Sequence, residues 1–178
     1  MSRLIRQRKI ISLRRGMYVL GELYRKVNPN PAVMANRIYT PSYLSFHWAL
    51  GYYGVIPEKV VLFTSATARV PRLFKNEFGS FQYKHIKPDC FTGYQTVDID
   101  GQKVLIAVPE KALLDLWHIE NREWTTERMA SMRFQNFEIV SRKKLEKYAE
   151  LYQSSRLLRA VKNWRVYVKA EMEGAKEL

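Results

Sequence analysis

Hydrophobic and polar positions alternate near the start of the chain. Between residues 9 and 20 apolar side chains occupy nearly every second position, and Gly16 separates the two halves of this pattern. A period of two residues is typical of half-buried strands, and glycine permits a sharp bend. The pattern predicts two short strands, residues 9–13 and 17–20, with a helical turn before them.

A turn-rich joint, Val-Asn-Pro-Asn-Pro, follows at residues 27–31. Each proline restricts the residue before it, and Asn30 can cap a helix that begins at Pro31. We therefore expect a helix over residues 31–37 and a domain boundary at the joint.

A second short helix is expected over residues 45–53. Ser45 is a suitable N-cap for it, and Gly54 is the usual residue type for a left-handed C-terminal cap.

The middle third has the periodicity of strands. Residues 59–64 form a β-branched apolar run, and residues 79–85 alternate between apolar and polar side chains. An Asp-Gly pair at 100–101 separates two further segments, 94–99 and 103–108, which is a strong hairpin signal. Three or four strands are predicted in this region.

The last third is predicted to be helical. Pro109 opens a helix with an apolar face that should be well buried. Thr125 or Thr126 can cap a segment that extends through Met132, and Ser141 can cap a longer helical region after it.

Together these elements predict an α+β protein. It should comprise a short N-terminal wing-like β-hairpin (a partial winged helix), a small mixed sheet with flanking helices, and a helical C-terminal part. The expected domains are residues 1–27 and residues 28–178, the latter divided into an α/β part (28–118) and a helical part (119–178).

The amino-acid composition indicates a strongly positive electrostatic potential at the surface. The chain has a formal net charge of +13 and a pI near 9.9, which favours a nucleic-acid or anionic-membrane partner. Its apolar stretches are too short for a membrane helix, and the charged first 15 residues do not form a signal peptide. The single Cys90 allows no intramolecular disulfide. We expect a cytoplasmic protein without a membrane partner.

The basic residues are densest in the first 15 positions. On a wing-like hairpin and the helix before it, such side chains would contact DNA phosphates and base edges, although a solvated charged face is the simpler alternative. The candidate DNA-binding residues are Arg3, Arg6, Arg8, Lys9, Arg14 and Arg15.

A second basic run lies on the C-terminal helices, interleaved with aromatic residues. It could hold nucleic acid, but a charged outer helix face explains most of it. The residues of this possible second basic surface are Arg142, Lys143, Lys144, Lys147, Arg156 and Arg159.

Catalytic signals are weak. The three histidines, at positions 47, 85 and 118, are far apart, and neither a phosphate-binding loop nor a zinc-protease motif occurs. Asp115 and His118 are only two potential metal ligands, whereas Lys111 and Asp115 have the spacing of an ordinary i,i+4 ion pair holding the helix surface. We expect no enzyme, no metal and no cofactor.

Several ordered segments nevertheless resemble one known family. They include a Pro-Ser-Tyr-x-Ser helix start and an Ala-x-Pro-Glu-Lys-Ala-Leu-x-Asp pattern after a strand. The segments are LRRGMYVL (13–20), YTPSYLSFHWALGYYGVIPEKV (39–60), TSATAR (64–69), FGSFQYKHI (78–86) and IAVPEKALLDL (106–116). On these residues the chain resembles the AbiEi family of type IV antitoxins over positions 4–117.

The resemblance implies a bacterial phage-defence protein that counteracts a nucleotidyltransferase-like toxin, without requiring a stable complex with it. It also implies repression of the protein's own operon through an N-terminal winged helix. Only residues 1–7 precede the first wing strand, so the winged helix looks truncated. Either the true start lies upstream, or the wing is supported differently, or DNA binding has been lost.

The predicted function is therefore that of an antitoxin and autorepressor. Operator DNA would be held by Arg14 and Arg15 on phosphates, with Arg3, Arg6 and Arg8 nearer the groove. The alternatives are a protein that neutralises a toxin without binding DNA and, less favoured, an enzyme that acts on nucleic acid through Glu110 or Asp115.

Overall fold

The computed structural model describes residues 2–174, and it confirms the predicted α+β class. The N-terminal part consists of α1 (Ser2–Arg6), β1 (Ile10–Arg14), β2 (Met17–Leu20) and the 3₁₀ turn η1 (Glu22–Tyr24). The central part consists of α2 (Pro31–Ile38), β3 (Tyr43–Leu44), α3 (Phe46–Tyr52), β4 (Phe63–Thr67), β5 (Arg72–Asn76), β6 (Gly79–His85), η2 (Pro88–Cys90), β7 (Tyr94–Ile99) and β8 (Gln102–Ala107). The C-terminal part consists of α4 (Pro109–Ile119), α5 (Thr126–Ser131), η3 (Phe137–Ile139), α6 (Arg142–Leu151) and α7 (Ser155–Gly174).

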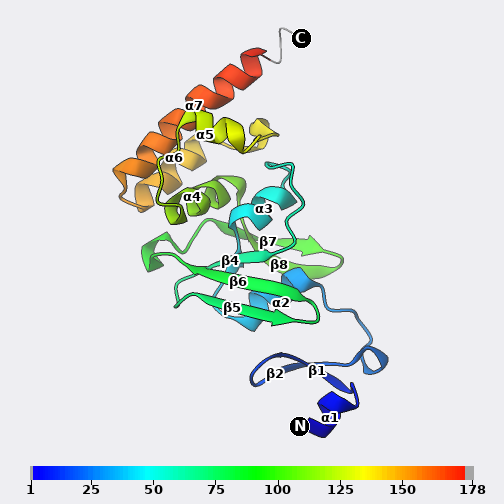
Figure 1. Ribbon diagram of the computed structural model, residues 1–178. Helices are drawn as coiled ribbons and strands as arrows, with labels where there is room; N and C mark the ends of the chain where they lie inside the picture. Colours follow the sequence, from blue (N-terminus) through cyan, green and yellow to red (C-terminus); the bar gives the residue numbers. More distant parts are fainter. Residues whose placement is uncertain (1, 175–178) are drawn as a thin grey trace.

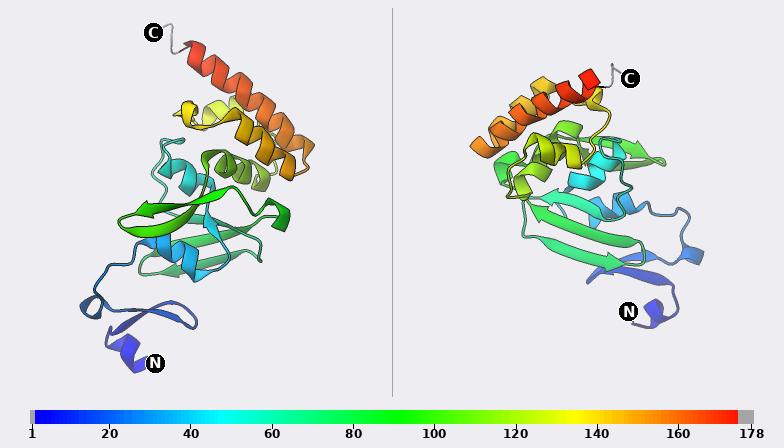
Figure 2. Two further views of the ribbon diagram at one scale, coloured as in Figure 1. Left: turned by 180° about the vertical axis from the view of Figure 1, so that it is seen from behind. Right: turned by 45° about the horizontal axis from the view of Figure 1, so that its top comes forward.

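A mixed six-stranded sheet forms the centre of the molecule, with strand order β5-β6-β4-β3-β8-β7. The β4–β6 and β3–β8 pairs are parallel, and the other neighbours are antiparallel. Helix α2 lies on one side of the sheet, and α3 and α4 lie on the other, with α5, α6 and α7 stacked beyond α4 (Figures 1 and 2). The N-terminal hairpin and the end of α7 therefore lie at opposite ends of the molecule.

Most locally encoded elements form where the sequence predicts them. The Asn30 side chain accepts a hydrogen bond from the Ala32 amide at 2.8 Å at the start of α2. Thr125 and Ser141 cap α5 and α6 in the same way. Asp100 and Gly101 have positive φ angles of 53° and 74° between β7 and β8, as a two-residue hairpin turn requires.

The predicted strand over residues 59–64 is wrong in its position. The strand β4 begins at Phe63, and the residues before it form a loop in which Val61 is 80% exposed. The apolar run was therefore not a sign of full burial. Strands β3 and β5 were not predicted, because β3 has only two residues and β5 is an edge strand with mixed burial.

Ser45 does not cap α3 as predicted. Its hydroxyl instead donates a hydrogen bond to Oδ2 of Asp115 at 2.7 Å, and no side-chain bond to the helix N-terminus is made by Ser45. The Thr64 hydroxyl on the neighbouring strand β4 accepts a hydrogen bond from the Trp48 amide at 3.3 Å and substitutes for the cap.

An aromatic cluster forms the core of the helical part. The Trp164 ring lies 5.8 Å from the Trp117 ring of α4 and 5.0 Å from the Phe134 ring, so α7 is fastened to α4. These side chains are at most 4% exposed and belong to the same hydrophobic core as the sheet. Among the helices of residues 2–174, none is both long and apolar enough to cross a membrane.

Candidate nucleic-acid interface

The basic N-terminal residues lie on a helix-plus-hairpin unit formed by α1, β1 and β2, which we call the α1-hairpin. Strand β1 pairs antiparallel with β2 from Ile10↔Leu20 to Arg14↔Met17, and Gly16 has a φ angle of +78° at the turn. The predicted hairpin and the helical turn before it are thus confirmed.

Gly21 packs against Arg8 and Lys9, the residues that connect α1 to β1. Its amide donates a hydrogen bond to the Lys9 carbonyl at 2.8 Å, and a Cβ atom at this position would lie 1.8 Å from the Arg8 carbonyl oxygen. No side chain can be placed there without a shift of the backbone, so glycine is required for this close approach.

Replacing Gly21 by Ala is expected to displace the connection between α1 and β1 from the end of β2 without unfolding the rest of the protein. We expect the backbone amide at position 21 to exchange with solvent about tenfold faster or more, since a strained contact of about 1.4 kcal/mol gives that factor. Hydrogen exchange measured by NMR checks this. Gly16→Asn is the matched control, because a Cβ there meets nothing within 4 Å and Asn tolerates a positive φ. Equal exchange rates in the two variants would contradict the assignment.

Arg14 docks the hairpin on the central part of the molecule. Its Nε donates to the Ile38 carbonyl at 2.6 Å, at the end of α2, and its Nη1 donates to the Arg15 carbonyl at 3.1 Å. The Asn76 side chain donates to the Leu13 carbonyl at 3.1 Å, and Leu13 is only 6% exposed. The structure thus gives Arg14 a docking contact, whereas the sequence predicts that it contacts phosphate alongside Arg15.

The other predicted cations of the α1-hairpin are exposed. Arg3 and Arg6 are three residues apart on α1 and so share one face of the helix. The ion pairs formed within residues 2–174 involve none of the N-terminal candidates. The exposed side chains are Arg3, Arg6, Arg8, Lys9 and Arg15.

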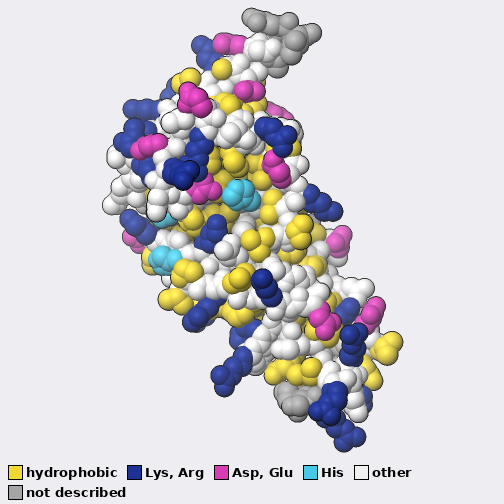
Figure 3. Space-filling model, in the orientation of Figure 1, with side chains coloured by type: hydrophobic (Ala, Val, Ile, Leu, Met, Phe, Trp, Pro, Cys, Tyr) yellow, Lys and Arg dark blue, Asp and Glu magenta, His cyan; other side chains and the backbone are white. Residues whose placement is uncertain are grey.

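A groove of about 430 Å³ lies between the α1-hairpin and the β5–β6 turn. Arg6, Arg8, Arg15 and Lys75 line it, together with the acidic Glu77. Lys75 was missed by sequence reasoning, because only the docking of the hairpin on β5 brings it there. Figure 3 shows Lys and Arg side chains gathered at this end of the molecule. None of these four cations takes part in an ion pair between the described residues, so the groove is basic.

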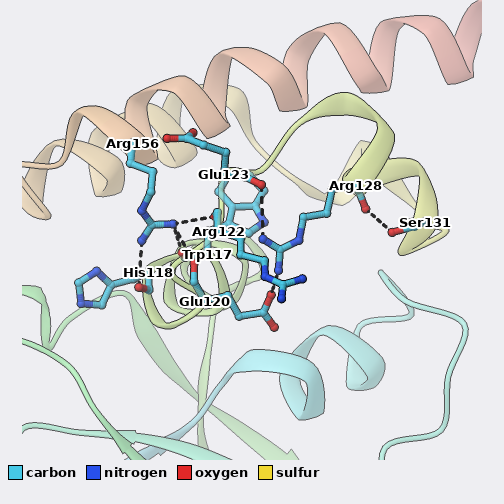
Figure 4. Close-up of polar contacts among 8 residues, drawn as sticks. All are labelled: Trp117, His118, Glu120, Arg122, Glu123, Arg128, Ser131 and Arg156. Carbon is cyan, nitrogen blue, oxygen red and sulfur yellow. Dashed lines mark hydrogen bonds and ion pairs between the residues drawn. The ribbon is translucent and has the colours of Figure 1, made fainter.

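The possible second basic surface is divided by the structure. Arg156 donates to four backbone carbonyls at the end of α4, among them those of Trp117 at 2.7 Å and His118 at 3.0 Å (Figure 4). It thus acts as a C-terminal cap of α4. Arg142 and Arg159 form ion pairs with Glu146 and Glu123. The exposed lysines of this surface that form no such pair within the described chain are Lys143, Lys144 and Lys147.

Lys111 and Asp115 are not a surface pair as predicted. Both side chains are 0% exposed, and they form an ion pair with each other. The Asp115 carboxylate also accepts hydrogen bonds from the hydroxyls of Ser45 at 2.7 Å, Tyr43 at 3.1 Å and Tyr152. Burial raises the pKa of Tyr43 and of Tyr152, and Asp115 adds to both shifts, so these phenols remain protonated donors.

Glu110 extends this buried polar region toward α6. Its side chain is 2% exposed, and Oε1 accepts a hydrogen bond from the Ser141 amide at 2.7 Å. Neither Glu110 nor Asp115 is therefore open to a nucleic-acid substrate.

The remaining groups of catalytic type in the described chain give no site. Burial raises the pKa of the Cys90 thiol, which favours the unreactive neutral form. Within residues 2–174, no group of three His, Cys, Asp or Glu side chains is placed to hold a metal ion.

The sequence was compared with models of known protein families and with curated proteins, and neither comparison gives a match.

Proposed function

We propose that this protein is a cytoplasmic antitoxin of a type IV toxin–antitoxin pair and that it represses its own operon. The antitoxin role is supported by the ordered resemblance to AbiEi proteins across residues 4–117. The repressor role is supported by one structural observation, the exposed cations of the α1-hairpin that form no ion pair with any residue of 2–174.

DNA is the partner that fits these cations best. Arg3 and Arg6 project from one face of α1, and Arg15 lies at the hairpin turn, so the unit offers charges at two separate places, as a winged helix does. Each Arg–phosphate contact releases counterions and adds affinity. Arg14 contributes indirectly, because it fixes the hairpin to Ile38.

Two measurements in cells test both halves of this proposal. A reporter is fused to the DNA upstream of the gene, and growth is followed while the neighbouring nucleotidyltransferase-like gene is expressed. We expect the protein to lower reporter output and to restore growth. Restored growth without repression would favour the alternative, a toxin-neutralising protein that does not bind DNA. Loss of both effects would contradict the proposal.

A further inference from the structure

Two adjoining cavities hollow the sheet face opposite α2. One has a volume of about 590 Å³ and the other about 440 Å³, and both are lined by Gln82 and Lys84 of β6. Gln82 and Lys84 alternate with the buried Phe81 and Tyr83, whose side chains face α2. We call this combined depression the β6 groove. It is bounded by β5 and β6 and by residues of α3, α4 and α5.

All three histidines of the chain line the β6 groove. His47 comes from α3, His85 from the end of β6 and His118 from α4. They are far apart in the sequence and carry no motif, so only the fold brings them to one surface. Figure 3 shows histidine side chains among hydrophobic ones where the helices meet the sheet.

Lys84 is the central charge of the groove. It is half-buried, its Nζ lies 5.3 Å from the centre of the Phe46 ring, and the ion pairs of the described chain do not include it. Burial lowers the pKa of Lys84, whereas the charge of Glu120 opposes that shift. A partly desolvated cation that forms no ion pair within residues 2–174 is costly, and a bound anion would relieve that cost.

Two carboxylates lie in this region, and each already forms an ion pair: Glu58 lines the smaller cavity, and the charge of Glu120 acts on Lys84. Glu58 pairs with Arg133 at 2.8 Å, and Glu120 pairs with Arg128. Arg72 lines the groove as a second cation without a partner among the described ion pairs. The groove therefore carries net positive charge.

The rest of the smaller cavity is mainly apolar. Ile56, Val60, Leu62 and Met132 form its wall, and the His47 ring lies beside them. Its volume of about 440 Å³ lies within the range of pockets that hold small molecules. An apolar wall beside one ammonium that has no ion-pair partner in the described part of the chain suits a molecule with an apolar body and one anionic end.

We propose that the β6 groove binds a small organic anion, with a carboxylate or phosphate head on Lys84 and an apolar body against Val60, Leu62 and Met132. This site is separate from the α1-hairpin and does not depend on the DNA-binding role.

Ligand titration of the full-length protein by NMR tests this site, because the three imidazole rings give three assignable reporters. The probes are octanoate, octyl phosphate and octanol, which share one apolar chain and differ in the head group. We expect saturable shifts of the His47 and His118 signals with at least one anionic probe. The uncharged octanol should bind at least about tenfold more weakly, since a charge-assisted contact contributes at least that factor. The tighter of the two anions identifies the head group.

Substitution of Lys84 tests the assigned contact. Lys84→Met should weaken binding of the preferred anion about tenfold or more, whereas Lys84→Arg should keep it within about threefold. Lys103→Met is the matched control, because Lys103 is an exposed strand lysine outside the groove, and this variant should bind like the unmodified protein.

Three results would overturn the proposal. They are octanol binding as tightly as both anions, unchanged anion binding by a folded Lys84→Met variant, and no saturable imidazole shift up to about 10 mM anion. If Lys84→Met does not fold, the comparison of octanol with the anions on the unmodified protein still decides the question.

Discussion

Replacing Asp115 by Asn is expected to lower the free energy of unfolding by about 3 to 5 kcal/mol, because it leaves the Lys111 ammonium buried without a counter-charge. Asn has nearly the same shape, and its carbonyl oxygen can still accept from Ser45 and Tyr43, which both donate to Oδ2 of Asp115. Its amide nitrogen then takes the place of Oδ1 and cannot accept from Tyr152. The loss therefore reports the charge and this one hydrogen bond, and not a cavity. Urea unfolding followed by circular dichroism measures it.

Two further variants separate the buried pair from a general effect of removing a carboxylate. Asp89→Asn, at an exposed acid in η2, should change the free energy of unfolding by less than about 0.5 kcal/mol. The double variant Lys111→Met/Asp115→Asn should be more stable than Asp115→Asn alone, since neither charge then remains buried. If Asp115→Asn is as stable as Asp89→Asn, the Lys111–Asp115 pair does not stabilise the fold as we describe.

The contacts of the buried pair give a structural role to the Pro-Glu-Lys-Ala-Leu-x-Asp segment at 109–115. Asp115 binds Ser45 and Tyr43 next to α3, Lys111 and Asp115 both contact Tyr152 at the end of α6, and Glu110 holds the start of α6. The motif therefore ties the sheet, α4 and α6 together, and its polar residues are structural in this fold.

Removing three exposed cations of the α1-hairpin together is expected to have the largest effect on DNA binding. The triple variant Arg6→Ala/Arg8→Ala/Arg15→Ala should bind the duplex upstream of the gene at least about 1,000-fold more weakly, since three charge-assisted phosphate contacts of roughly 1.5 kcal/mol each are lost. Fluorescence anisotropy at one fixed salt concentration checks this.

The matched control removes as many charges from the opposite end of the molecule. The variant Lys143→Ala/Lys144→Ala/Lys147→Ala carries the same net charge as the arginine variant, so a general loss of attraction would weaken both equally. We expect it to bind within about threefold of the unmodified protein. The opposite order of affinities would move the DNA interface to α6.

Sequence reasoning succeeded where the signal is local. The Asp100-Gly101 turn, the Asn30 and Ser141 caps and the Gly16 bend each act through one or two neighbouring residues, and each forms as predicted. The i,i+4 spacing of Lys111 and Asp115 also predicted their pairing correctly.

It failed where tertiary neighbours decide the outcome. The burial of Lys111 and Asp115 depends on Tyr43, Ser45 and Tyr152, which lie 37 to 72 residues from Asp115 in the chain. Ser45 has the residue type of a cap, but a buried carboxylate competes for its hydroxyl.

The interface and the groove show the same limit. The sequence does not distinguish Arg14 from the neighbouring basic residues, because its role depends on the contact with the Ile38 carbonyl in the folded protein. The three histidines gave no motif, because the β6 groove is assembled from α3, β6 and α4.

Hydrogen exchange with and without the upstream duplex tests the central claim most directly, because it maps the DNA-binding face without any substitution. We predict that the duplex slows amide exchange in residues 2–20, which form the α1-hairpin, and leaves the exchange rates in α6 and α7 unchanged. Protection confined to the helices of residues 142–174, or an unprotected α1-hairpin in a saturated complex, would contradict the account.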